Sequence, residues 1–161
     1  MGKLVVVKGD PVTGTDTHNV SGQGTTPSGT VSYTGTADFA YDGAVTGQLS
    51  DFVSIGGVPV AVVTSRSALN AGEDTAPNGK HSGPKGTNFV PTTPVPVPSS
   101  MSITDTPLGT GVPNAGAGSA LLTVGGVKVL LDADKIDTCS GVGAKADSTV
   151  TAQGQDFVTS A

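Results

Sequence analysis

Short apolar runs interrupted by glycine pairs dominate the pattern of hydrophobic and polar positions. Residues 52–67 (FVSIGGVPVAVVTSRS) and 121–136 (LLTVGGVKVLLDADKI) share one order: apolar residues, Gly-Gly, Val, a short β-branched run and a polar turn. A tight hairpin turn needs positive φ at both central positions, which the glycines at 56–57 and 125–126 can supply. Each segment is therefore predicted to be a β-hairpin.

The N-terminus resembles a third copy that lacks its first strand. Residues 2–12 (GKLVVVKGDPV) follow the spacing of the second half of the hairpin at 121–136, and in this register Asp10 falls on Asp134. Self-similarity of this kind predicts repeated supersecondary units. We expect three related β arms.

The intervening segments carry weak helix signals. Residues 38–52 have some helical spacing, but glycines interrupt it. Residues 22–36 are rich in Gly, Ser and Thr and predict an extended connection, and residues 108–120 predict a long turn. The prolines of residues 90–100 favour polyproline or edge-strand conformation, since proline cannot pair in a central strand. The prediction is an all-β fold with little or no helix.

Composition narrows this prediction to a small domain with a thin core. A chain of 161 residues has the length of one ordinary domain, so a single domain over 1–161 is expected. With 24 Gly, 11 Pro, no Trp and 4% aromatic residues, small branched side chains must fill the core.

Charge and cysteine content exclude several classes of function. The formal charge is -5, and the 8 basic residues are scattered, which argues against nucleic-acid binding. One cysteine cannot form an intramolecular disulfide. The apolar run at the N-terminus is too short for a signal peptide, so we expect synthesis in the cytoplasm.

Two similar pentapeptides, DTHNV at 16–20 and DTCSG at 137–141, lead into a histidine and into the single cysteine. Zinc accepts both imidazole nitrogen and thiolate sulfur among four tetrahedral ligands. We predict that His18, His81 and Cys139 hold one metal ion. The fourth ligand is left open among Asp16, Glu73, Asp74, Asp137 and water.

Two other interpretations of the same residues remain open. In the first, the two histidines are turn residues with satisfied hydrogen bonds, and Cys139 is a small buried apolar side chain. In the second, Cys139 pairs with a histidine as the nucleophile of a hydrolase. A small surface or secreted β module that binds a partner or carbohydrate without metal is the alternative outside enzymes. No nucleophile elbow or phosphate-binding glycine motif supports an enzyme.

Four segments together resemble the proline-alanine-alanine-arginine (PAAR) tip proteins of contractile injection systems. They are IGGVPVAVVTSRS from residue 55, GDPVTGTDTHNV from residue 9, GKHSGPKGTNFVP from residue 79 and ADKIDTCSG from residue 133. The similarity runs in order over nearly the whole chain, although of the name-giving letters only Ala61 is kept.

The resemblance implies a cone-shaped β domain that caps a trimeric, VgrG-like spike in a type VI secretion-like or phage tail-like machine. It further implies an apical zinc held by three histidines and one cysteine. His18, His81 and Cys139 match three of these ligands, whereas the third histidine is absent, so another side chain completes the site or the metal is not zinc but, for example, iron. Effector cargo and transient contact with a target membrane are further implied, and no enzymatic activity.

Overall fold

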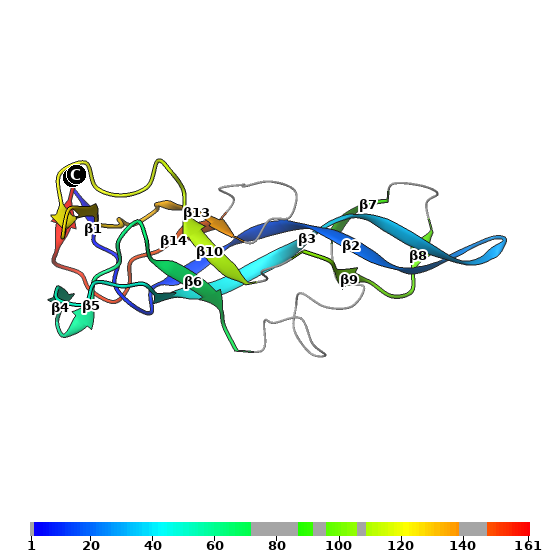
Figure 1. Ribbon diagram of the computed structural model, residues 1–161, viewed down its shortest axis with the longest axis horizontal. Helices are drawn as coiled ribbons and strands as arrows, with labels where there is room; N and C mark the ends of the chain where they lie inside the picture. The colour runs from blue at the N-terminus through cyan, green and yellow to red at the C-terminus, as the bar shows by residue number, and fades with distance from the viewer. Residues whose placement is uncertain (1, 72–86, 92–95, 106–108, 139–147) are drawn as a thin grey trace.

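The computed structural model describes residues 2–71, 87–91, 96–105, 109–138 and 148–161. Within these ranges the chain forms β-strands and no helix, which confirms the all-β prediction. No helix in them could cross a membrane. The molecule is elongated, with short hairpins at one end and the turn of one long hairpin at the other (Figure 1).

Six antiparallel strands close into a ring in the middle of the molecule. They pair in the order β2, β3, β6, β10, β13, β14, and β14 pairs back with β2. Closure satisfies strand edges that would otherwise need cover. The strands are β2 (Pro11–Thr26), β3 (Gly29–Gly47), β6 (Arg66–Leu69), β10 (Thr110–Pro113), β13 (Lys135–Thr138) and β14 (Ser148–Val150).

Strand β10 lies where a long turn was predicted for residues 108–120. It pairs with β6 on one side and β13 on the other. A Cβ atom on Gly111 would lie 2.1 Å from Ser67 Oγ, so the glycine permits this close approach. The composition of the segment therefore reflects tight strand packing and not only a turn.

Three short hairpins form one end of the molecule, which we call the base (residues 2–10, 50–65, 119–134 and 155–161). Both predicted hairpins are confirmed, with positive φ at all four glycines of their turns. In the third hairpin the two ends of the chain pair with each other, so the C-terminal strand supplies the strand that the N-terminal copy lacks. The hairpins are β4 (Ser54–Ile55) with β5 (Val58–Pro59), β11 (Thr123–Val124) with β12 (Val127–Lys128), and β15 (Thr159–Ser160) with β1 (Lys3–Leu4).

Backbone hydrogen bonds join the three hairpins in a closed cycle. The amide of Val6 donates to the carbonyl of Leu130 at 3.0 Å, Leu130 donates to Ala61 at 3.0 Å, and Ala61 donates to Val6 at 2.9 Å. Bridges Val5–Leu131, Val7–Val60 and Val62–Val129 flank this cycle. The base therefore has approximate three-fold symmetry within one chain.

A polar side chain closes the turn that follows each hairpin. Asp10 Oδ2 accepts the amide of Val7 at 2.7 Å and Asp134 Oδ2 that of Leu131 at 2.8 Å. In the remaining copy Ser65 Oγ accepts the amide of Val62 at 3.0 Å. The predicted alignment of Asp10 with Asp134 is thus confirmed.

The long hairpin of β2 and β3 continues beyond the ring and forms the opposite end of the molecule (Figure 1). Its register runs without a break to Thr26 opposite Gly29, so the predicted connection at residues 22–36 is paired strand. Three strands flank the hairpin, and β7 and β8 end the sheet, as the prolines predicted. They are β7 (Thr87–Pro91), β8 (Val97–Pro98) and β9 (Ser102–Ile103). We call residues 19–37, 87–91 and 96–104 the distal half.

The core consists of three apolar clusters stacked from the base to the distal half. Aliphatic side chains form the base cluster, Tyr41 joins them in the ring cluster, and Tyr33 and Phe39 enter the third cluster. Valines of the hairpins form the base cluster, and Leu130 and Tyr41 belong to the cluster inside the ring. The distal cluster contains Tyr33, Phe39 and Met101. The predicted thin core of small branched side chains is found in the base.

Candidate metal centre at the distal rim of the ring

His18 lies in the middle of β2 and not in a turn. The alternation of a strand puts Asp16, His18 and Val20 on its buried side, and His18 has 0% exposure. Its ring lies 5.7 Å from that of Phe39 on β3. The interpretation of His18 as a turn residue is therefore wrong, because the pairing of β2 with β3 runs through it.

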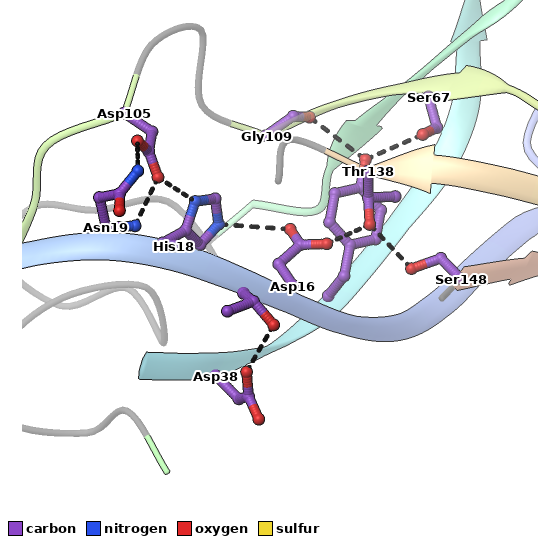
Figure 2. A network of polar contacts seen from close by, with 11 residues as sticks. Asp16, His18, Asn19, Asp38, Ser67, Asp105, Gly109, Thr138 and Ser148 are labelled. Carbon is purple, nitrogen blue, oxygen red and sulfur yellow. Dashed lines mark hydrogen bonds and ion pairs between the residues drawn. The ribbon is translucent and has the colours of Figure 1, made fainter. Parts of the chain in front are cut away.

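Two carboxylates face the two nitrogens of the His18 ring (Figure 2). Nδ1 lies 3.2 Å from Asp105 Oδ2, and Nε2 lies 3.5 Å from Asp16 Oδ2. Asp105 is held in place by Asn19, whose backbone amide donates to Oδ2 at 2.7 Å and whose side-chain amide donates to Oδ1 at 3.0 Å. This arrangement orients the imidazole from both sides.

Asp16 also joins β2 to the far side of the ring. The hydroxyl of Thr138, the last residue of β13, donates to Asp16 Oδ1 and lies 2.9 Å from Ser148 Oγ on β14 (Figure 2). All three side chains are buried. Three strands thus converge on the Asp16 carboxylate.

The two carboxylates around His18 can be satisfied either by a ring that carries both protons or by a cation shared between Nε2 and Asp16. A neutral imidazole has one N–H, so with both nitrogens facing carboxylates one lone pair would point at an anion. In the second case Asp105 would accept the proton of Nδ1, as in metal sites where a carboxylate accepts from the non-ligating nitrogen. Zinc bonds of about 2.0–2.2 Å at tetrahedral angles separate two ligand atoms by about 3.3 Å, close to the 3.5 Å between Nε2 and Asp16 Oδ2.

The other two predicted ligands, His81 and Cys139, lie outside the described residues. In the chain order His81 stands between β6 and β7, and Cys139 stands between β13 and β14. Cys139 follows Thr138, whose side chain bonds Asp16. Within the described ranges no group of three or more His, Cys, Asp or Glu side chains is arranged to hold a metal.

Of the two candidate side chains for a fourth ligand that lie among the described residues, Asp16 is the one next to His18. Asp137 accepts hydrogen bonds from the Asn114 side chain at 3.2 and 3.3 Å, and as the neighbour of Thr138 it lies on the opposite face of β13. The two Asp-Thr pairs are therefore not equivalent, because Asp16 is buried in the first and Thr138 in the second. Glu73 and Asp74 lie outside the described residues.

Sequence reasoning missed Asp105. It follows the charge-free segment of residues 86–104, and its position next to His18 depends on the pairing of β9 with β2, which brings residues 103 and 20 together. The only available signal was that Asp105 is the first acidic residue after this segment.

A second candidate surface lies on the base, where three large apolar side chains are exposed. Phe52 is 74% exposed, Leu121 77% and Phe157 68%. They occupy equivalent positions in the three hairpins. In each, the residue after the exposed side chain donates its backbone amide to the side-chain oxygen of the residue two positions before it. These hydrogen bonds are Val53 to Ser50 Oγ, Leu122 to Ser119 Oγ and Val158 to Gln155 Oε1.

Comparisons with known proteins give no relative. No protein-family model, no curated protein and no solved structure matches the chain.

Proposed function

We propose that the chain is a structural, non-enzymatic, PAAR-like tip that caps a trimeric spike of a contractile injection system. Its base sits on the blunt end of the spike, and its distal half sharpens the assembly for membrane puncture. The chain is made in the cytoplasm and acts at the end of the particle, where effector cargo can travel with it. The machine is type VI secretion-like or phage tail-like.

The three-fold base is the observation that carries this proposal. A homotrimer presents three identical sites around an axis, so one chain can engage all of them only if it repeats its own contacts three times. Phe52, Leu121 and Phe157 are such a repeat, and exposed aromatic and leucine side chains of this size mark interaction sites. The cyclic hydrogen bonds behind them make the base rigid.

A metal ion at the rim of the ring completes the proposal. His18 Nε2 would bind it, with Asp16, His81 and Cys139 as the further ligands, and Asp105 would orient the ring of His18. When bound, zinc or iron would tie β2 to residues 81 and 139, which are far from it along the chain. Such long-range links restrict the unfolded chain most, which suits a part that must resist unfolding under load.

Binding to a spike tests the docking half of the proposal. The purified chain is mixed with a trimeric spike protein from the same source, and the mass of the complex is measured by light scattering. We expect one chain per three spike chains. Replacing Phe52, Leu121 and Phe157 together by serine should abolish the complex.

Val90→Ser with Val97→Ser is the matched control, because these valines are 62% and 73% exposed in the distal half. This control should leave the complex intact. If the base variant binds as well as the wild type, or if the chain binds a carbohydrate surface but no trimer, the spike-tip proposal is wrong and a partner-binding module is favoured.

Elemental analysis of protein without a metal-binding tag tests the metal half. About one zinc or iron per chain is expected, with loss of the metal in His18→Ala, Asp16→Ala, His81→Ala and Cys139→Ala. Asp137→Ala is the control that should keep it. Metal retained in His18→Ala would contradict the proposed site.

A further inference from the structure

Two of the three copies in the base carry an acidic residue directly before the exposed apolar side chain. The tripeptide Asp-Phe-Val occurs at 51–53 and 156–158, and Ala-Leu-Leu stands in its place at 120–122. Asp51, Asp156 and Ala120 are all exposed. They occupy one equivalent position of the repeat, so the acid is present in two copies and replaced by alanine in the third.

The fold of the base does not require this acid. Among the described residues, the side chains of Asp51 and Asp156 form no hydrogen bond or ion pair. The backbone amide of the apolar residue that follows donates to the equivalent side-chain oxygen in all three copies, at 3.4, 3.0 and 3.0 Å in chain order. Because Ala120 lies in the same bend with the same hydrogen bond, the two carboxylates are free to act on a partner.

These two carboxylates are also the only exposed charges that repeat within the base. Its exposed lysines lie at three different positions of the repeat: Lys3 and Lys8 are three residues before and two residues after Val6, and Lys128 is two residues before Leu130. A trimeric partner meets the three copies with three identical surfaces. A charged group on that partner therefore finds a repeated counterpart only at the position of Asp51 and Asp156.

We propose that the end of the spike that receives the base carries one basic side chain, Lys or Arg, next to each of its three apolar sites. Asp51 and Asp156 pair with two of these side chains, and the third faces Ala120. This inference rests on the proposed function and names the chemistry of the partner's surface. Opposite charges around an apolar contact speed association and fix its register, and the net charge of -5 on the chain adds attraction at longer range.

The experiment measures the affinity of the chain for the trimeric spike protein from the same source. At low salt, Asp51→Asn with Asp156→Asn should weaken binding roughly tenfold, and Asp51→Lys with Asp156→Lys roughly a hundredfold. In about 1 M salt the Debye length falls to about 3 Å, so the wild type and the asparagine variant should bind with nearly equal affinity.

Ala120→Asp is the sharper test, because it supplies the acid that the third copy lacks. It should strengthen binding about threefold at low salt. Ala120→Asn is the matched control of similar size without charge and should not strengthen it. Ser28→Asp adds the same charge in the exposed turn at the opposite end of the molecule and should leave the affinity unchanged.

The outcomes separate this inference from the proposed function. Wild-type affinity in both the asparagine and the lysine variants would overturn the inference, as would an Ala120→Asp protein that binds no more tightly than Ala120→Asn. In either case a wild-type complex of one chain with three spike chains would leave the proposed function standing. If the wild-type chain forms no complex with the trimer at low or high salt, the proposed function and this inference are both wrong.

Discussion

The base and the distal half are both all-β, but they are organised on different principles. The base repeats one hairpin three times, and its backbone hydrogen bonds close in a cycle. The distal half is a single long hairpin flanked by three short strands, and nothing in it is repeated. Three-fold repetition suits a surface that meets a symmetric partner, whereas a single pointed end needs no symmetry.

Leu130→Ala in the base should give the largest loss of stability. Leu130 is fully buried, and both its amide and its carbonyl belong to the cycle of hydrogen bonds. Truncation of a buried leucine costs about 2–5 kcal/mol. Denaturant unfolding should show this loss, whereas Leu121→Ala, at a 77% exposed position of the base, should change stability by less than about 0.5 kcal/mol. If Leu130→Ala and Leu121→Ala lowered the stability equally, the residues of the hydrogen-bonded cycle would not be the part of the base that stabilises it most.

Gly22→Ala should weaken the distal half and leave the base intact. A Cβ atom there would lie 2.1 Å from the carbonyl oxygen of Ser100, which is backbone and cannot rotate away. The expected loss is about 1–3 kcal/mol, as for other overpacked sites. Hydrogen exchange should show faster exchange at residues 99–104 and unchanged exchange at 129–131.

Gly47→Ala is the control for this substitution, because its added Cβ atom would meet only Arg66 Cβ at 3.6 Å. Faster exchange in the base of the Gly22→Ala protein would show that the two regions unfold as one unit.

Local signals made most of the base predictable. The paired glycines determine two hairpins, and the alignment of Asp10 with Asp134 identified the third copy. The first strand of that third copy was also marked in the sequence. The tripeptide Asp-Phe-Val occurs at 51–53, before the first strand of one hairpin, and again at 156–158, before the C-terminal strand. That match was missed, since pairing between the two ends of a chain has no local signature.

The distal half and the surroundings of His18 depend on contacts between segments far apart in sequence. The prolines of residues 90–100 predicted polyproline or edge-strand conformation, and β8 is an edge strand, but no signal predicted that it pairs with β2. The distance of 86 residues between Asn19 and Asp105 likewise left Asp105 out of the site, although it contacts His18. Of the three predicted ligands, only His18 lies among the described residues.

Tyr33→Phe should have a smaller effect, confined to the distal half. The substitution removes the hydrogen bond to the Ser100 carbonyl, which is worth about 0.5–1.5 kcal/mol. Burial raises the pKa of Tyr33 above its usual value of 10.0. The stability that comes from the neutral phenol is therefore fully present below pH 10 and is lost as the pH rises through the folded-state pKa.

Thermal unfolding between pH 8 and pH 11 checks this expectation. The difference in unfolding temperature between the wild-type protein and Tyr33→Phe should shrink towards the alkaline end of the range. A constant difference between the two proteins would contradict the assignment of a raised pKa.

Circular permutation should have the smallest effect, because it changes only which hairpin of the base is open. Lys3 pairs with Ser160 at the place where Ile55 pairs with Val58 and Val124 with Val127, on either side of a Gly-Gly turn. Joining Ser160 to Lys3 through Gly-Gly and opening the chain between Gly125 and Gly126 should thus exchange equivalent hairpins. We expect a cooperative unfolding transition within about 1 kcal/mol of the wild type, since each change alters only a short loop. A permutant that fails to fold would show that the three hairpins, though alike in their hydrogen bonds, are not interchangeable in stability.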